Sequence, residues 1–163
     1  MYIKLNYDNI KNSIPYGDRS QSIIEPLLTE QWFANAKFLS KKAIEVVKPG
    51  AFLGDIGYEI QTHAENNHYS VVEEYCGHGI GKIYHDDPQI LHYGKPKTGL
   101  QIEEGMCFTI EPMINLGTKF TKVLSDGWTV ETKDGRNSAQ WEHTLTVTAT
   151  GSEVLTARSE ENF

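Results

Sequence analysis

Three short segments of the chain contain residue types that could perform metal or acid–base chemistry. They are the glycine-rich stretch from His78 to His85, the stretch around Glu111 and the stretch around Glu142. Both glutamates lie within apolar runs, where a buried charge is costly unless it is paired, hydrogen-bonded or bound to a metal. One imidazole and several carboxylates that converge from different strands suit Mn²⁺, Fe²⁺ or Co²⁺, and Zn²⁺ is also compatible. Two ions bridged by carboxylates could activate a shared hydroxide as a nucleophile.

Each of these residues also has a simpler interpretation. A histidine in a glycine-rich turn, as His78 is, usually serves as a polar loop residue. Ile110 and Pro112 flank Glu111, so this carboxylate could point to solvent from an alternating strand, and the same holds for Glu142. The remaining histidines have no partner at an informative spacing and are interpreted as surface or core-edge residues: His63, His68, His92 and His143.

Two helices are predicted ahead of these segments. The first begins after Thr29, a good N-cap, and ends at Pro49 and Gly50. The second runs from Asp55 to about Asn66, with Asn66 and Asn67 suited to a left-handed C-cap. Apolar residues recur at helical spacing in both: Trp32, Ala36, Leu39, Ala43 and Val47 in the first, and Ile56, Ile60 and Ala64 in the second.

Beyond Tyr69 the pattern favours strands separated by Gly and Asp. The predicted strands cover residues 70–75, 106–114, 128–132, 140–148 and 153–156. Two helices followed by several strands with an antiparallel pattern indicate an α+β fold, in which the helices lie on one face of the sheet.

Composition narrows the function classes. A chain of 163 residues with 39% hydrophobic residues suits a single domain over 1–163. The formal charge of −7 argues against a nucleic-acid partner. Cys76 and Cys107 lie outside any C-x-x-C spacing, which excludes a cysteine zinc site. We find neither a signal peptide nor a membrane-length apolar run, so we expect a cytoplasmic protein without a membrane partner.

Taken in order, the segments resemble the type I methionine aminopeptidases. The match runs from Val46 through the His78 turn, the Asp87–Tyr93 loop and Glu111 to the Asp126–Val130 stretch and Glu142, about two-thirds of the chain. The resemblance implies a pita-bread (creatinase/aminopeptidase-like) half-domain with a curved antiparallel sheet and helices on one face. It also implies two divalent metal ions, Mn, Fe, Co or Zn, and release of methionine from peptide N-termini.

The resemblance also implies roles for individual residues. His78, Glu111 and Glu142 match the family's histidine and two glutamate metal ligands, and Glu111 would in addition transfer a proton. His85 matches a second histidine that binds the substrate and acts in catalysis. Tyr84 and Trp128 would help to line the pocket for the methionine side chain.

Two aspartate ligands complete the set in this family. Asn6 and Asp8, followed by Gly17 and Asp18, fit the family pattern with one residue deleted between them. Asp8 could equally be a surface charge at a strand end, and Asp18 an ordinary turn residue. Arg19 places a long cation where the family usually has a small polar residue.

Complete members of the family carry a further half-domain ahead of these aspartates. From this we expect a weakened or inactive aminopeptidase, and whether the chain is an enzyme stays open. The alternative is a non-catalytic binding protein, of the immunity or inhibitor type, derived from a truncated aminopeptidase. A homodimer or a protein partner is expected to cover the face that the missing half would have packed against.

Overall fold

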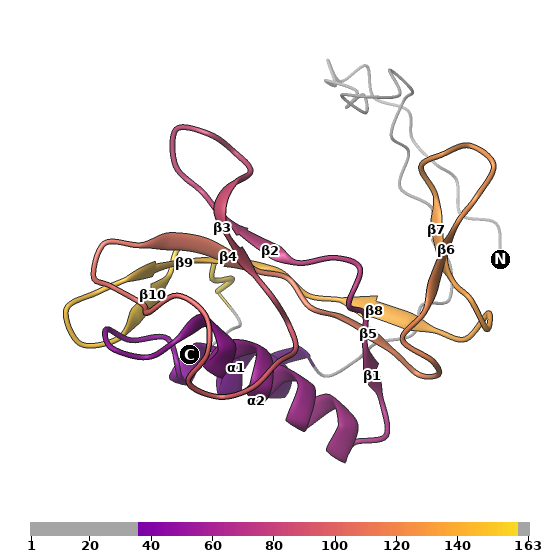
Figure 1. The fold of residues 1–163 in the computed structure, drawn as a ribbon, viewed down its shortest axis with the longest axis horizontal. Coiled ribbons are helices and arrows are strands. Elements are labelled where there is room, and N and C mark those ends of the chain that lie inside the picture. The colour runs from indigo at the N-terminus through magenta and orange to yellow at the C-terminus, as the bar shows by residue number, and fades with distance from the viewer. Residues whose placement is uncertain (1–35, 160–163) are drawn as a thin grey trace, which may run out of the picture. The chain divides into compact units, whose positions relative to one another are not determined.

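The computed structural model describes residues 36–159. It contains two helices, α1 (Ala36–Glu45) and α2 (Leu53–Asn66), which pack against each other (Figure 1). The start of α2 is fixed by Asp55, whose Oδ2 accepts a hydrogen bond from the backbone N–H of Phe52 at 2.8 Å. Such a contact satisfies one of the backbone donors left free at a helix start.

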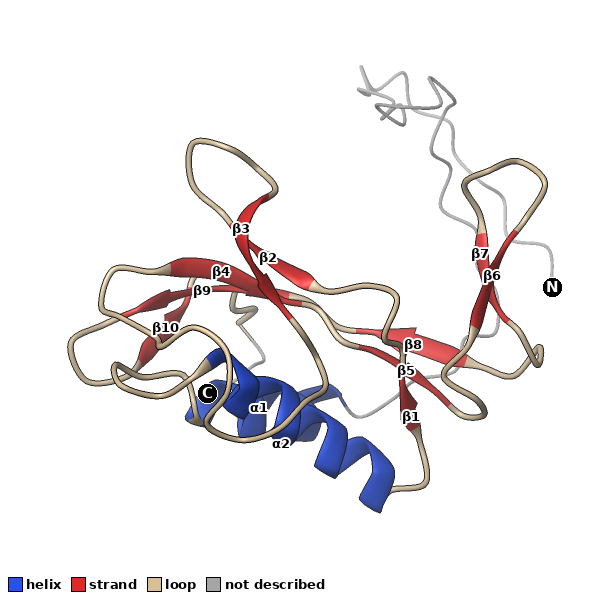
Figure 2. Ribbon diagram, in the orientation of Figure 1, coloured by secondary structure: helices blue, strands red, loops and turns tan. Residues whose placement is uncertain are grey.

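Within the described range 36–159, ten strands follow the helices and pair with one another in antiparallel fashion (Figure 2). A five-stranded sheet has the order β10-β9-β4-β2-β3, a three-stranded sheet the order β1-β5-β8, and β6 pairs with β7. Their bounds are β1 Ser70–Val71, β2 Gly77–Gly79, β3 Asp86–Ile90, β4 Cys107–Ile110, β5 Met113–Asn115, β6 Thr121–Val123, β7 Val130–Thr132, β8 Ser138–Gln140, β9 His143–Val147 and β10 Ser152–Val154.

The core lies between the two helices and one face of the five-stranded sheet. Along β4 and β9, Phe108, Ile110 and Leu145 are fully buried in the same cluster as Ile56 and other residues of the helices. Because side chains alternate along a strand, Thr109 and Glu111 point to the opposite face. The packing therefore leaves one face of β4 and β9 for the candidate chemistry.

Two predicted long strands are each interrupted, at matching places. Residues 106–114 divide into β4 and β5, and residues 140–148 contribute to β8 and β9. The pair Ile110–His143 closes one side of the interruption and the pair Met113–Gln140 the other. Two residues lie between these two pairs on each strand, so the register is the same on both sides of the interruption. The interruption therefore leaves the pairing of the two strands unshifted.

The α+β class and the antiparallel pairing are confirmed, with corrections of detail. The first helix ends at Glu45 rather than at Pro49, and its predicted beginning lies outside the described residues. After α2, the left-handed conformation belongs to His68, with φ of 63°, while Asn67 has φ of −103°. Within residues 36–159, no helix is long and apolar enough to cross a membrane. The single domain over 1–163 stays a prediction.

Candidate metal centre

His78 lies at the centre of β2, between two glycines that bring this strand close to its neighbours. A Cβ on Gly77 would overlap the carbonyl oxygen of Thr109, and one on Gly79 would overlap the carbonyl oxygen of Asp87. Only glycine allows so close an approach of backbones. The glycine-rich segment interpreted from the sequence as a turn is thus a tightly packed strand, and it holds His78 against β4.

The imidazole of His78 has a defined orientation. Its Nδ1 lies 2.9 Å from the carbonyl oxygen of Gly79, and because a carbonyl only accepts hydrogen bonds, Nδ1 carries the proton. In the neutral ring, Nε2 therefore presents a lone pair, and it lies 3.6 Å from Oε1 of Glu111. A histidine that ligates a metal through one nitrogen usually donates its other N–H in this way.

Glu111 is held at both its backbone and its side chain. Its N–H donates to Nε2 of the buried His92 at 3.1 Å. Its Oε1 accepts a hydrogen bond from the hydroxyl of Thr109 at 2.8 Å. Burial raises the pKa of Glu111; the bond from Thr109 works against this rise, and the carboxylate of Glu142 adds to it. The carboxylate is thus fixed in place, and the effect of burial on its pKa is larger than the lowering effect of His78 and His85.

Glu142 lies directly opposite Glu111. The register on both sides of the interruption pairs these two residues, just as it pairs Ile110 with His143. Like charges opposite each other on a sheet destabilise it, and the effect of Glu142 on the pKa of Glu111 reflects this repulsion. Glu142 is itself exposed, so the described residues bring one carboxylate, that of Glu111, against the imidazole of His78, with a second carboxylate across the strand pair.

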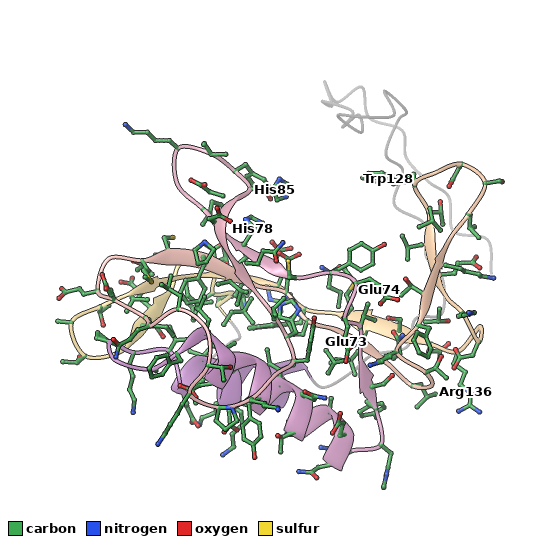
Figure 3. All side chains as sticks on the ribbon, in the orientation of Figure 1. Glu73, Glu74, His78, His85, Trp128 and Arg136 are labelled. Atoms are coloured by element: carbon green, nitrogen blue, oxygen red, sulfur yellow. The ribbon has the colours of Figure 1, made fainter. Side chains whose placement is uncertain are left out.

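His85 and Tyr84 follow His78 in the connection that leads to β3. The rings of His78 and His85 have centroids 4.4 Å apart, and Tyr84 meets the His85 ring edge-on at 4.6 Å. Figure 3 shows the two histidines close together at the base of this loop. Both Tyr84 and His85 are exposed, so they are accessible to a ligand beside the Glu111 carboxylate, whose pKa His85 also lowers.

Trp128 lies on the β6–β7 hairpin and is 66% exposed (Figure 3). Together with Tyr75, Met113 and Gln140 it lines a mainly apolar hollow of about 640 Å³. Tyr84 is not among the residues that line this hollow. The two residues expected to share one methionine pocket thus have different surroundings in the described structure.

In the part of the chain that the structure describes, His78 contacts Glu111 at 3.6 Å and forms ring contacts with Tyr84 and His85. The strand register sets Glu142 opposite Glu111. Asp8 and Asp18 lie outside the described residues. Within residues 36–159, no group of three or more His, Cys, Asp or Glu side chains is arranged to hold an ion. The donor types nevertheless suit a divalent cation, because Nε2 of His78 and Oε1 of Glu111 face each other and both are able to ligate one.

Two buried histidines correct the sequence interpretation. His92 and His143, expected at the surface or core edge, are 1% and 2% exposed. Burial lowers the pKa of His92 to about 4, which keeps its ring neutral and able to accept the hydrogen bond from Glu111. His68 is exposed and His63 half-buried, as expected. The sequence feature that could have indicated the burial of His92 is its place in the apolar run that follows Ile90.

Comparison with known proteins places this geometry in context. The model of metallopeptidase family M24 matches residues 21–149. The chain is 59% identical to the methionine aminopeptidase of Rickettsia prowazekii over 117 residues, which are 71% of the chain and 45% of that protein. It is 51% identical to the methionine aminopeptidase of Escherichia coli strain K12 over 121 residues, 74% of the chain and 46% of that protein.

Solved structures of methionine aminopeptidases also resemble this chain. The crystal structure of the Rickettsia prowazekii methionine aminopeptidase matches with a TM-score of 0.72 and 56% identity, over 74% of this chain and 49% of that one. The enzyme of Thermotoga maritima matches with a TM-score of 0.73 and 43% identity, over 75% and 49%. The pita-bread expectation is thereby confirmed. The chain spans about half the length of the curated relatives that it matches.

Proposed function

The chain belongs to metallopeptidase family M24, and from this premise we propose that it supplies one part of a methionine aminopeptidase site, which removes methionine from peptide N-termini. The observation that carries the proposal is the facing pair of His78 Nε2 and Glu111 Oε1, 3.6 Å apart. A lone pair and a carboxylate oxygen repel each other unless a proton or a metal ion lies between them. The choice of reaction is supported by the two relatives named above, which are methionine aminopeptidases at 51% identity and more.

Divalent ions, when bound, would supply Lewis-acid chemistry for hydrolysis of the first peptide bond. His78, Glu111 and Glu142 would hold them together with Asp8 and Asp18, and the ions would be Mn²⁺, Fe²⁺, Co²⁺ or Zn²⁺. This assignment is supported by the donor types and by the register that sets Glu111 opposite Glu142. An imidazole with carboxylates does not select among the four ions.

The protein groups would then position the substrate and move protons. Glu111, whose pKa is raised chiefly by burial, is suited to accept and return a proton during the reaction. His85, exposed beside the His78 ring, would donate a hydrogen bond to the substrate near the scissile bond. Trp128 would line the methionine side chain, a role supported by the apolar hollow it shares with Met113, and Tyr84 would flank the site from the His85 side.

Weak or absent turnover, a non-catalytic binding role and a covering partner stay predictions. One experiment tests the proposal itself. The chain is purified without chelator, its metal content is measured, and release of methionine from Met-Ala-Ser is compared with release of leucine from Leu-Ala-Ser. We expect bound divalent metal and methionine-selective release, however slow, both of which disappear in Glu111→Ala.

The matched control is Glu153→Ala, which removes an exposed carboxylate from β10. It should leave metal content and release unchanged. Metal content or methionine release that is the same in Glu111→Ala as in the unaltered chain would contradict the proposal.

A further inference from the structure

The hydroxyl of Thr109 connects the two groups of the candidate metal centre. Its oxygen accepts the backbone N–H of His78 at 3.0 Å and lies 2.8 Å from Oε1 of Glu111. Thr109 is 1% exposed, so its hydroxyl makes both contacts away from bulk water. A single side chain thus touches both the strand that carries His78 and the carboxylate that faces His78.

The direction of these hydrogen bonds follows from what a hydroxyl can do. A threonine hydroxyl has one proton to donate and two lone pairs that accept. The N–H of His78 uses a lone pair. Two acceptors are within reach of the proton, Oε1 of Glu111 at 2.8 Å and the carbonyl oxygen of His78 at 3.5 Å. The shorter distance assigns the proton to Glu111.

This arrangement replaces a regular ladder bond. Gly79 pairs with Phe108, so the same register sets His78 opposite Thr109, and the N–H of Ile80 donates to Cys107 as expected. In a regular antiparallel ladder the N–H of His78 would donate to the carbonyl of Thr109. It donates to the hydroxyl instead. The side chain has taken the place of the backbone acceptor at the point where the ladder meets the candidate site.

We propose that Thr109 is a positioning residue for the metal centre, which holds the Glu111 carboxylate and the His78 strand at the separation that a divalent cation requires. The inference rests on the proposed function, since it concerns the same two groups. Thr109 acts through Glu111 and His78 and does not itself contact the cation. Loss of such a supporting hydrogen bond typically weakens metal affinity by about 10–100-fold.

The test uses two pairs of variants that each differ by one hydroxyl in the full chain. The unaltered protein is compared with Thr109→Val, which has nearly the same shape. Thr109→Ser is compared with Thr109→Ala, which keeps the hydroxyl comparison interpretable if valine disturbs folding. Affinity for Co²⁺ is measured by calorimetry, with the visible absorption of bound Co²⁺ as a report of its coordination. Unfolding curves without metal give the fraction folded.

We expect Co²⁺ affinity per folded molecule to fall at least about tenfold in Thr109→Val and in Thr109→Ala, with an altered Co²⁺ spectrum. Thr109→Ser should retain both. Without metal, hydrogen exchange of the His78 amide should accelerate in the variants that lack the hydroxyl and stay slow in Thr109→Ser. Thr146→Val, a half-buried change on β9 opposite Cys107 of β4, should leave all readouts unchanged.

The outcomes separate the two proposals. If the unaltered chain binds Co²⁺ and the hydroxyl-lacking variants bind it equally well with the same spectrum, Thr109 has a merely structural role and the inference is overturned. If the unaltered chain binds no Co²⁺, the proposed function fails and the inference fails with it.

Discussion

The backbone N–H of Glu111 donates to Nε2 of His92 at 3.1 Å, and this histidine is fully buried. A ring nitrogen can accept a hydrogen bond only while it is unprotonated. Burial lowers the pKa of His92 to about 4, so the acceptor is present throughout the neutral range. A residue that was not predicted as a ligand thereby fixes the backbone from which Glu111 projects.

Replacing His92 should test this support. His92→Phe fills the space but leaves the N–H of Glu111 without its acceptor, which typically costs about 1–3 kcal/mol. His92→Gln offers an oxygen at a position similar to that of Nε2 and should retain more of the stability. Chemical unfolding of the metal-free proteins provides the comparison. Equal stability of the two variants would show that the hydrogen bond contributes nothing.

The pH dependence of stability should reveal the same histidine. Above about pH 6.5 His92 is neutral in both the folded and the unfolded chain. Between about 6.5 and 4 the unfolded chain takes up a proton that the folded chain refuses, so stability is lost as the pH falls. Unfolding curves from pH 7.5 to 4.5 should show a steeper loss in the unaltered chain than in His92→Gln. Parallel curves would contradict the buried, neutral state.

Glu111→Gln should have opposite effects with and without metal. Burial and the facing Glu142 raise the pKa of Glu111, so its ionised form costs stability above the folded pKa, and this cost disappears below the unfolded value of about 4.5. Metal-free Glu111→Gln should therefore melt higher at pH 7.5, by about 2–4 °C if about 1 kcal/mol is recovered, and the gap should close toward pH 4.5.

Added Mn²⁺ or Co²⁺ should reverse this order, because a cation that binds the folded chain stabilises only the protein that retains the carboxylate. Scanning calorimetry with and without the ion measures both effects. Glu153→Gln is the control and should behave as the unaltered chain does. A metal-free Glu111→Gln that is less stable at pH 7.5 would show that the carboxylate is satisfied without a cation.

Gly77→Ala should displace His78. The new Cβ would overlap the carbonyl oxygen of Thr109, and since this atom is backbone, the strands must separate at a cost of about 1–3 kcal/mol. Gly81→Ala is the matched control, because a Cβ there meets nothing within 4 Å. Melting temperature and the exchange rate of the His78 amide should change in the first variant and stay constant in the second.

Trp128→Ala should show whether Trp128 serves the substrate pocket or the stability of the fold. The side chain is 66% exposed, so its loss should change stability by no more than about 0.5 kcal/mol. If it lines the methionine side chain, the KM for Met-Ala-Ser should rise while metal content stays the same. An unchanged KM would remove Trp128 from the substrate pocket.

Apolar spacing was sufficient to predict α2, since Ile56, Ile60 and Ala64 are the buried face of that helix. The same pattern could not show that the strands around Glu111 and Glu142 are interrupted, because the run of apolar residues continues across the interruption. Motif resemblance pointed to His78 and the two glutamates. Thr109 escaped it because a threonine in a strand is ordinary, and only the hydrogen bonds to His78 and Glu111 distinguish it.

The matched interruption at residues 111–112 and 141–142 has a consequence for how the sequence can vary in length. One residue inserted in the β4–β5 stretch or in the β8–β9 stretch would turn one carboxylate to the opposite face of the sheet. Only a compensating insertion in the other stretch would restore the Glu111–Glu142 pair. The connection from Leu116 to Asn137, which carries β6 and β7, is free of this constraint. Insertions, deletions and grafted segments should therefore be tolerated in that connection and rejected on either side of it.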